Sequence, residues 1–325
     1  MSGTDPGGTM KPLLASLVAT LALAGTAAPA AAQSSALPAE VRAKIAEMGP
    51  VLTPDLIRTT MEMFAPLAKP TALAGIKVSE DLAYGADERN KLDLFQPEGK
   101  RHLPILVFIP GGGFVGGNKR SNDAIYANIG AYFARHGLLT LIANYRLAPL
   151  HPWPAGAEDV GKVVAWARAN AAAYGGNSRR IFLMGHSAGA THVASYVFDS
   201  SLHPKEGAGI AGAILVSGFY EVKPAELAPN ITAYFGTDQA QFAARSPITH
   251  VGESKLPLFI AVAEYDPPFL EIPSLDLAAR VCARDGKCPR LAWLKGHNHI
   301  SELASVNTKD EALSRQVLDF LRTTR

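Results

Sequence analysis

Short apolar runs alternate with longer amphipathic stretches through most of this chain. The apolar runs predict strands at residues 76–78, 92–95, 103–109, 138–144, 181–184, 212–217, 256–263 and 291–294. Between them, helical patterns occur at residues 122–136, 155–174, 188–198 and 275–284. Several of the strands are apolar without interruption, which is typical of strands buried on both faces. This order predicts one α/β domain at 74–325, with a mainly parallel eight-stranded sheet and helices on both faces.

A separate helical segment, residues 33–73, is predicted ahead of this domain. Two short helices broken near Gly49 are expected, because apolar residues such as Val41 and Ile45 recur at helical spacing. The segment either forms an N-terminal helical cap over a site on the sheet or only covers the sheet. Its methionines, Met63 among them, would pack equally well in either position.

The first residues have the pattern of a targeting segment. Lys11 precedes a short apolar core, and three alanines at residues 30–32 provide a cleavage end, so residues 1–32 predict a secretory signal peptide. The apolar core is too short for an ordinary transmembrane helix, so no stable membrane insertion is expected. We therefore expect an exported protein, periplasmic or secreted after cleavage near Ala32, and leave open whether Met10 is the true start.

Composition limits the kinds of binding partner that this chain can have, and cysteine spacing predicts a disulfide. The 325 residues carry 31 basic and 29 acidic side chains, a net charge of +2, and 48% of them are hydrophobic. This balance provides no basic stripe for a phosphate backbone and so disfavours nucleic acid as a partner, while the apolar content excludes a disordered chain. Cys282 and Cys288 flank an Asp-Gly turn, which in an exported chain favours a disulfide over two free thiols or a zinc site.

The sharpest chemical feature is Ser187, in the pentapeptide Gly185-His186-Ser187-Ala188-Gly189. A serine on so tight a strand-to-helix turn projects above the sheet edge, and glycines on both sides avoid clashes there. The helix behind it offers the Ala188 N–H to a developing oxyanion. His186 is expected to point away from the site and to pack structurally. Because a serine hydroxyl needs a base to take its proton, a histidine and an acid are expected later in the chain.

Two later loops provide candidates for these partners. Asp266 follows the strand predicted at 256–263, at the end where such sheets hold their sites, and is the expected acid. Glu264 and Asp276 are the alternatives. The loop after the last predicted strand offers His297 and His299 as the base, and spacing alone does not decide between them.

A second glycine-rich turn, Pro110-Gly111-Gly112-Gly113-Phe114, ends the strand predicted at 103–109. Without side chains, backbone N–H groups can converge on one oxygen, so Gly112 and Gly113 are the expected oxyanion donors beside Ala188. A phosphate-binding loop is disfavoured, because the Gly-Lys-Ser/Thr of such loops is missing. Glycines of this turn also match a dinucleotide fingerprint, but the acidic residue expected about twenty positions later is missing. We therefore expect no cofactor and no metal.

Taken together, these motifs resemble the α/β-hydrolase carboxylesterases of the hormone-sensitive-lipase-like group, which includes bacterial esterases and lipases. The resemblance covers residues 85–325 and rests on four blocks in the right order, at 91–97, 110–114, 144–160 and 180–189. It implies the α/β-hydrolase fold and a catalytic triad of Ser187, Asp266 and His299. His299 is preferred over His297 because the family's histidine lies in a Gly-x-x-His segment, as His299 does.

Two positions depart from the family's pattern. Pro110 stands where the family has a histidine that braces the glycine turn, so this turn must be held in another way, for example by proline's fixed φ. Leu150 replaces an acidic residue within the third block. Neither change removes a catalytic group, because the oxyanion donors are backbone N–H groups.

The resemblance implies a serine carboxylesterase that hydrolyses short- to medium-chain or small aromatic esters through an acyl-enzyme intermediate. Its expected partner is a small-molecule ester, contacted by Phe114, Trp153 and Met63. An amidase or formamidase-type acyl hydrolase with the same triad is one alternative, and a non-catalytic binding protein with a hydrolase fold is the other. The physiological substrate and the oligomeric state stay open.

Overall fold

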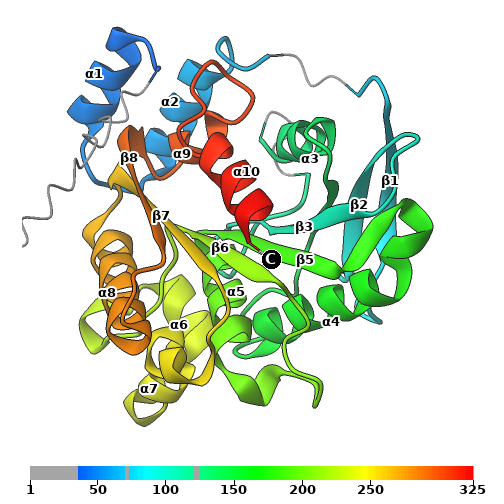
Figure 1. Cartoon of the computed structure of the whole chain (residues 1–325). Helices are drawn as coiled ribbons and strands as arrows, with labels where there is room; N and C mark the ends of the chain where they lie inside the picture. Colours follow the sequence, from blue (N-terminus) through cyan, green and yellow to red (C-terminus); the bar gives the residue numbers. More distant parts are fainter. Residues whose placement is uncertain (1–35, 70–72, 121–124, 325) are drawn as a thin grey trace, which may run out of the picture. The chain divides into compact units, whose positions relative to one another are not determined.

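An eight-stranded sheet, in the order β1-β2-β4-β3-β5-β6-β7-β8, runs through the computed structural model, which describes residues 36–69, 73–120 and 125–324 (Figure 1). Its strands are β1 (Ile76–Ala83), β2 (Lys91–Pro97), β3 (Leu103–Ile109), β4 (Leu139–Ala143), β5 (Gly176–His186), β6 (Gly212–Val216), β7 (Leu258–Tyr265) and β8 (Arg290–Asn298). β2 is antiparallel to both of its neighbours, β1 and β4, whereas the other neighbouring strands are parallel. The eight predicted strands and the α/β-hydrolase fold are confirmed.

Helices cover both faces of the sheet because strand side chains alternate between its two faces. The longer ones after β1 are α3 (Tyr126–Arg135), α4 (Ala155–Asn170), α5 (Ala188–Phe198), α8 (Pro268–Asp285) and α10 (Ser314–Thr323). Ile105 and Val107 of β3 point to the core shared with α4, α5 and α8. Leu106 and Phe108 point to the opposite core, shared with α3 and α10. Burial on both faces explains the uninterrupted apolar runs.

The two predicted N-terminal helices are α1 (Ala39–Met48) and α2 (Pro54–Phe64). Val41, Ile45 and Phe64 enter the same core as α3 and α10, so both helices pack on that face of the sheet. The unit Gln33–Arg325 includes them together with the sheet. The predicted signal peptide lies outside the described residues.

Several helices depart from the predicted pattern. The short helices α6 (Pro229–Phe235), α7 (Phe242–Arg245) and α9 (Ser301–Ala304), as well as α10, were not among the predicted elements. α8 also starts earlier than predicted, at Pro268, because proline is tolerated in the first turn of a helix. The predicted disulfide is confirmed, since Cys282 in α8 is bonded to Cys288 six positions later. Within the described part of the chain, no helix is both long enough and apolar enough to cross a membrane.

Strand register brings the chemically interesting loops to one edge of the sheet. Ile109, at the end of β3, pairs with Gly185 of β5, so the glycine turn and Ser187 leave adjacent strands. Tyr265 of β7 pairs with Asn298 of β8, which places the following acid and histidine loops side by side. All of these loops follow the carboxyl ends of parallel strands, where open α/β sheets hold their sites.

Candidate active site

Ser187 lies on the turn between β5 and α5 in a strained backbone conformation. Its φ is 55° and its ψ is −127°, a combination that costs a non-glycine residue about 1–3 kcal/mol. A Cβ atom on Gly185 would lie 2.4 Å from the Gly189 carbonyl oxygen, and one on Gly189 would lie 2.1 Å from the Ile109 oxygen. Backbone therefore packs against backbone around the serine, which is the reason predicted for the two glycines.

The buried hydrogen bond of the site joins His299 to Asp266. Nδ1 of His299 lies 2.9 Å from Oδ1 of Asp266 and must donate, because a carboxylate only accepts. Asp266 has no exposed surface and accepts two more hydrogen bonds on Oδ2, from Ala263 N at 2.8 Å and from Ser217 Oγ at 2.5 Å. Three donors offset the loss of water around this carboxylate. With Nδ1 engaged, Nε2 is the nitrogen of His299 left to accept a proton.

The alternative acids and base make other contacts. Glu264 accepts a hydrogen bond from Gly296 N at 2.7 Å, and Asp276 forms an ion pair with Arg280 on α8 at 3.1 Å. His297 is buried, with its Nε2 3.6 Å from a carboxylate oxygen of Asp310. Of the candidates from the two loops, His299 and Asp266 are the pair that the structure brings together.

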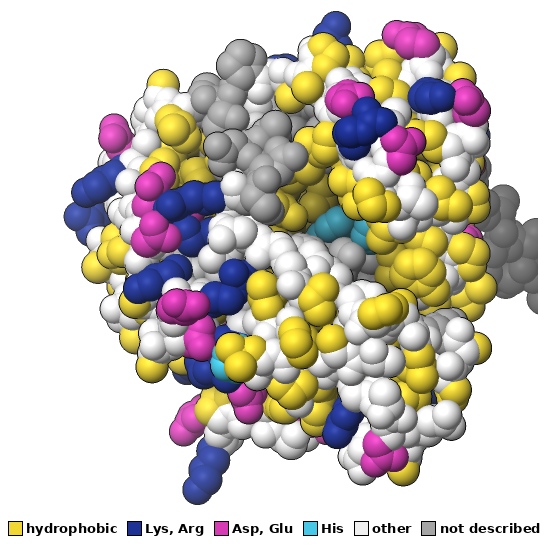
Figure 2. Space-filling model, turned by 180° about the vertical axis from the view of Figure 1, so that it is seen from behind, with side chains coloured by type: hydrophobic (Ala, Val, Ile, Leu, Met, Phe, Trp, Pro, Cys, Tyr) yellow, Lys and Arg dark blue, Asp and Glu magenta, His cyan; other side chains and the backbone are white. Residues whose placement is uncertain are grey.

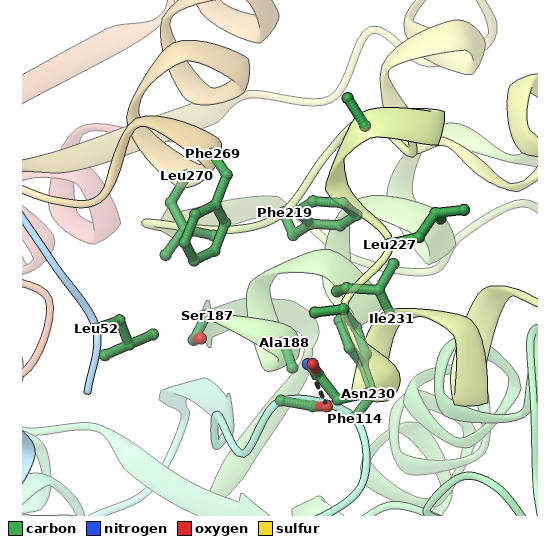
Figure 3. A pocket seen from close by; sticks show the side chains of 13 residues that line it. Leu52, Phe114, Ser187, Ala188, Phe219, Leu227, Asn230, Ile231, Phe269 and Leu270 are labelled. Atoms are coloured by element: carbon green, nitrogen blue, oxygen red, sulfur yellow. Dashed lines mark hydrogen bonds between the residues drawn. The ribbon is translucent and has the colours of Figure 1, made fainter. Parts of the chain in front are cut away.

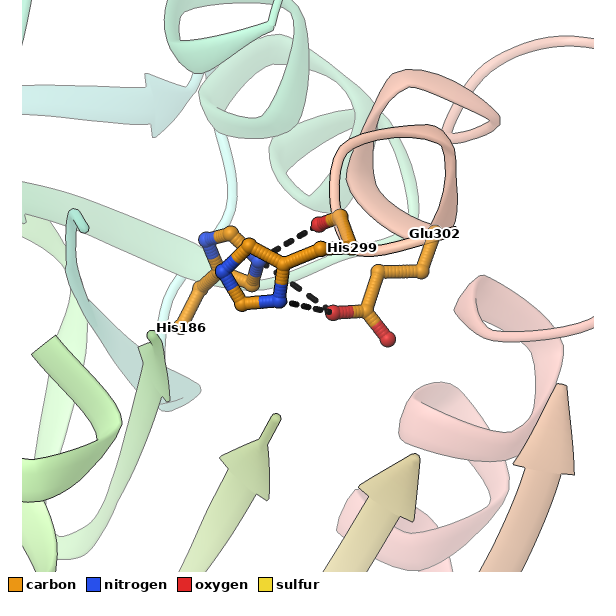
Figure 4. Close-up of side chains that lie close together, drawn as sticks. All are labelled: His186, His299 and Glu302. Atoms are coloured by element: carbon orange, nitrogen blue, oxygen red, sulfur yellow. Dashed lines mark hydrogen bonds and ion pairs between the residues drawn. The ribbon is translucent and has the colours of Figure 1, made fainter. Parts of the chain in front are cut away.

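A second buried carboxyl, that of Glu302, lies beside His299 and His186 (Figure 4). Its Oε2 is 3.0 Å from Ser217 Oγ, and its Oε1 is 3.2 Å from His186 Nε2. His186 Nε2 donates to the carbonyl oxygen of His299 at 2.9 Å, which agrees with the structural role predicted for it. Its ring does not lie away from the site, however, because its centroid is 4.5 Å from that of the His299 ring. Burial, with the nearby His299, lowers the pKa of His186 well below its usual value. Burial, with the nearby Asp266, raises the pKa of Glu302 well above its usual value. The sequence interpretation missed Glu302, although its position three residues after His299 was a usable signal.

The loop that carries His299 is held by Asn298. The Asn298 side-chain oxygen accepts hydrogen bonds from the backbone N–H groups of Ile300 and Ser301. Its Nδ2 donates to Thr60 Oγ1 of α2 at 2.9 Å, in a buried contact. An N-terminal helix is therefore hydrogen-bonded to the residue next to His299.

Ser187 opens into an apolar cavity of about 690 Å³ (Figure 3). Its apolar walls include Leu52, Phe219, Leu227, Ile231, Phe269 and Leu270. Among the described residues that line it none is ionisable, and Asn230 provides its amide group. On the face shown in Figure 2, hydrophobic side chains border a hollow in which a histidine is visible.

Of the three expected substrate contacts, the structure places one at this cavity. Phe114 lines it and stacks on Tyr234 with ring centroids 4.8 Å apart. Trp153 instead packs into the apolar cluster around Phe114, and Met63 packs against the core on the α3 face of the sheet. Neither is among the described residues that line the cavity. α2 contributes Met63 to the core, whereas Leu52, just before α2, reaches the cavity.

The glycine turn after β3 is braced by two side chains from distant segments. Arg89 Nη2 donates to the Gly117 carbonyl oxygen at 2.8 Å. Asn230 Nδ2 donates to the Gly113 carbonyl oxygen at 3.1 Å. These contacts hold the turn in a chain where Pro110 stands in place of the bracing histidine that the sequence resemblance implied.

Close backbone packing fixes the conformation of the same turn. Gly112 has a φ of +146°, and a Cβ atom there would lie 2.1 Å from the Gly116 carbonyl oxygen, so a side chain does not fit. Gly116 N donates to the Gly112 carbonyl oxygen at 3.0 Å. Gly113 and Ala188, two of the expected oxyanion donors, both line the cavity beside Ser187. Backbone N–H groups at these positions can receive a developing negative charge.

The sheet, the serine on its strained turn and the buried histidine–carboxylate pair define an α/β-hydrolase. The sequence pattern of the prolyl oligopeptidase family matches residues 154–324, and the chain belongs to this family. A second pattern, BD-FAE, matches residues 92–200.

Curated relatives of this chain include two esterases of Mycobacterium tuberculosis (strain ATCC 25618 / H37Rv). Esterase LipQ is 27% identical over 264 residues, which cover 75% of this chain and 62% of LipQ. Esterase LipC is 37% identical over 108 residues, which cover 33% of this chain and 26% of LipC. The chain thus spans less than two thirds of the length of either relative.

Solved structures with the same fold include an arylesterase and an esterase from the bacterial hormone-sensitive lipase family. The arylesterase has a TM-score of 0.65 at 18% identity, covering 88% of this chain and 98% of its own. The second esterase has a TM-score of 0.65 at 22% identity, covering 88% of this chain and 97% of its own. At these identities the likeness shows the fold alone. The family match and the curated esterases are what confirm the resemblance inferred from the sequence.

Proposed function

We propose that this protein is a serine carboxylesterase with Ser187 as nucleophile, His299 as general base and Asp266 as the acid that orients it. One observation carries the proposal: a histidine bonded to a buried carboxylate lies at the sheet edge where a strained serine opens into an apolar cavity. The names of the relatives, LipQ and LipC among them, support an ester as the substrate.

In the first step, Ser187 Oγ attacks the ester carbonyl carbon while His299 Nε2 takes the serine proton. Asp266 holds the Nδ1–H tautomer and stabilises the imidazolium that forms. The N–H groups of Gly112, Gly113 and Ala188 bind the oxyanion, and removing one such donor typically costs roughly 10²–10³-fold in kcat. His299 then returns the proton to the departing alcohol, which leaves an acyl group on Ser187.

In the second step, a water molecule gives a proton to His299 and attacks the acyl carbon. The oxyanion forms again on the same N–H groups. Collapse of the intermediate releases the carboxylic acid and returns the proton to Ser187 Oγ. Every bond made or broken in this cycle involves the chain's own groups, the ester and water.

The cavity supports uncharged esters of short to medium acyl chain, or small aromatic esters, as substrates. Its volume of about 690 Å³ falls within the range of small-molecule sites. Phe114, Phe219 and Phe269 offer aromatic surface to an acyl or aryl group. A charged substituent would lose its water there without gaining an ionic partner among the described lining residues.

We also propose that residues 33–73 form a cap at the site and that residues 1–32 are a signal peptide. Leu52 in the cavity wall and the Thr60 contact with the histidine loop support a role for the N-terminal segment at the site. The disulfide between Cys282 and Cys288 supports an oxidising compartment, since such bonds persist in exported proteins.

Initial rates on p-nitrophenyl acetate, butyrate, octanoate and palmitate test the proposal, with Ser187→Ala as the blank. The expected result is serine-dependent turnover that falls steeply beyond octanoate. The matched p-nitroanilides test amide hydrolysis, which the prolyl oligopeptidase family pattern favours as the second candidate. Turnover of anilides without turnover of esters would move the assignment to an amidase, and folded protein inactive on both would contradict a hydrolase.

A further inference from the structure

Two buried carboxyl groups share one hydroxyl group behind the proposed base. Ser217 Oγ lies 2.5 Å from Asp266 Oδ2 and 3.0 Å from Glu302 Oε2, and neither acid has exposed surface. A serine hydroxyl has a single proton, so it donates to one of the two oxygens. Both hydrogen bonds can exist together when the other carboxyl is protonated and donates its own proton to Ser217 Oγ.

The contacts of the two acids decide which one carries the proton. Asp266 also accepts from Ala263 N and His299 Nδ1, so each of its two oxygens already acts as an acceptor and the extra proton is better placed on Glu302. Glu302 Oε1, in contrast, forms no hydrogen bond with the described residues, although it lies 3.2 Å from His186 Nε2. The shift in the Glu302 pKa, upward through burial and the nearby Asp266, agrees with this assignment.

The groups that face Glu302 come from four elements. His299 precedes α9, the helix that carries Glu302, and its Nδ1 lies 3.9 Å from Glu302 Oε1. His186 comes from β5, Asp266 follows β7, and Tyr220, whose pKa is raised by burial, follows β6 with Ser217. Among these described neighbours there is no lysine or arginine to neutralise an ionised Glu302.

We propose that Glu302 is a neutral positioning residue, whose protonated carboxyl donates to Ser217 so that the Ser217 proton points to Asp266. Asp266 is thereby held toward His299 Nδ1. Neutrality also matters for turnover: a second negative charge 3.9 Å from His299 Nδ1 would over-stabilise the imidazolium and hinder return of its proton to the leaving alcohol. This inference rests on the proposed function, because the orientation of His299 affects rate only if His299 is the base.

Three substitutions test the role in catalysis. Glu302→Gln keeps the shape, the neutrality and a donor, so kcat within about threefold of the unmodified protein and an unchanged pH–rate profile are expected. Glu302→Leu removes the donor, and kcat is expected to fall roughly 10- to 100-fold with KM unchanged. Ser217→Ala breaks the same chain of hydrogen bonds. The fall in kcat for Ser217→Ala is expected to be similar. In the double variant with Glu302→Leu, kcat is expected to fall no further than in either single variant.

Two further measurements need no turnover, so they separate failure of this inference from failure of the esterase assignment. At neutral pH, the infrared spectrum of the unmodified protein is expected to contain the C=O band of a protonated carboxyl, which Glu302→Gln removes. Glu302 keeps its proton in the folded protein at pH values at which the unfolded chain has lost it. Raising the pH above the ordinary pKa of glutamate therefore lowers the stability of the unmodified protein but not that of Glu302→Gln. The gain in Tm from Glu302→Gln is therefore expected to grow between pH 5 and pH 8.

The outcomes are decisive in each direction. A missing carboxyl band, or a Glu302→Gln variant as impaired as Glu302→Leu, would show that an ionised Glu302 is what the site uses and would overturn the proposal. A band that is present while folded Glu302→Leu keeps full kcat would overturn the positioning role. If Ser187→Ala retains activity, the esterase assignment fails, whatever the infrared result is.

Discussion

The two sides of Ser187 are built by different means. On one side, the turn that contains Gly112 and Gly113 presents backbone N–H groups and is packed so closely that a side chain at Gly112 has no room. On the other side, His299 and Asp266 belong to a buried cluster of polar side chains that includes Glu302. The glycine side works because it has no side chains, whereas the polar side works because its side chains are particular donors and acceptors.

This difference separates two ways in which substitutions would damage the site. On the glycine side, an added methyl group collides with backbone, which cannot move away without carrying the N–H groups with it. On the polar side, a removed group leaves a buried donor or acceptor without its partner. The first kind of damage is steric and independent of pH, whereas the second involves groups that titrate.

Ser187→Ala removes Oγ, the proposed nucleophile on which both sides act, and has the largest expected effect on turnover. A fall in kcat of roughly 10⁵–10⁶-fold is expected, because the remaining groups have no nucleophile to activate. Steady-state rates on p-nitrophenyl butyrate measure it. Ser195→Ala is the matched control, since Ser195 lies on the same helix and its buried hydroxyl has no partner among the described residues. Equal activity of the two variants would refute Ser187 as the nucleophile.

Replacing each histidine of the last loop isolates the polar side. His299→Ala is expected to lower kcat/KM by roughly 10⁵-fold, because no other group then takes the serine proton. His297→Ala is expected to cost less than about tenfold, since its contacts are with Ser301 and Asp310 rather than with Asp266. Circular dichroism of both variants verifies folding. The reverse order of effects would move the general base to His297.

Gly112→Ala isolates the glycine side. Its Cβ would meet the Gly116 carbonyl oxygen at 2.1 Å, so the turn must shift and its N–H groups leave the oxyanion position. The expected loss in kcat is roughly 10²–10³-fold with little change in KM. Gly116→Ala is the matched control in the same turn, because its Cβ would contact the Gly112 oxygen at an ordinary 3.4 Å. Similar losses in both variants would contradict the assigned donor.

Acid pH tests the packing beneath the glycine side. Burial lowers the pKa of His192 to about 3, and its ring lies 5.4 Å from the Phe114 ring. The unfolded chain protonates this imidazole below its ordinary pKa of 6.5 while the folded chain does not, so stability falls as pH falls below 6.5. At pH 5 the contribution of His192 to the loss of unfolding free energy is expected to be about 2 kcal/mol. Urea unfolding at pH 7 and pH 5 measures the loss in unfolding free energy. The loss in His192→Gln is expected to be smaller than that of the unmodified protein by the contribution of His192. Equal losses in the two proteins would reject a neutral buried His192.

Reduction of the disulfide has the smallest expected effect on the site, because the bond touches neither side of Ser187. The bond between Cys282 and Cys288 closes a short loop, for which the chain-entropy estimate is about 2 kcal/mol of stability. Reductant is expected to lower Tm by a few degrees and to leave kcat unchanged. The double variant Cys282→Ser/Cys288→Ser, treated identically, is the control. An unchanged Tm together with two titratable thiols would show that the bond does not form in solution.

Local patterns account for what could be predicted from the sequence. The apolar runs predicted all eight strands. The signal is clearest in strands buried on both faces, such as β3 and β4, where it is complete within five or six residues. The serine turn and the loop with Asp266 were visible for the same reason: each directly follows such a run. The choice of His299 over His297 needed the family resemblance, since both histidines follow the strand predicted at 291–294 at similar spacing. In the structure His297 lies within β8 and His299 directly follows it.

Contacts between distant segments account for what could not be predicted. The position of Glu302 three residues after His299 was a local signal, but its contact with Ser217 depends on the register of β6, β7 and β8, which no local pattern encodes. Asn230 braces the glycine turn from a helix that the sequence interpretation did not include. Trp153 was expected at the cavity as an aromatic side chain suited to an aromatic ester, and Met63 as part of an N-terminal cap. Both pack elsewhere, because apolar character does not distinguish a cavity wall from the core.

The hydrogen bond between Thr60 and Asn298 has a consequence for the order in which the site is completed. Its two residues are 238 positions apart, so it closes one of the longest loops in the fold. Contacts of such separation are slow to form. During synthesis, α2 emerges early, but its partner beside His299 follows nearly all of the sheet. A chain still growing would therefore contain the serine long before it contains a positioned base, and hydrolysis would begin only when the last strand has docked.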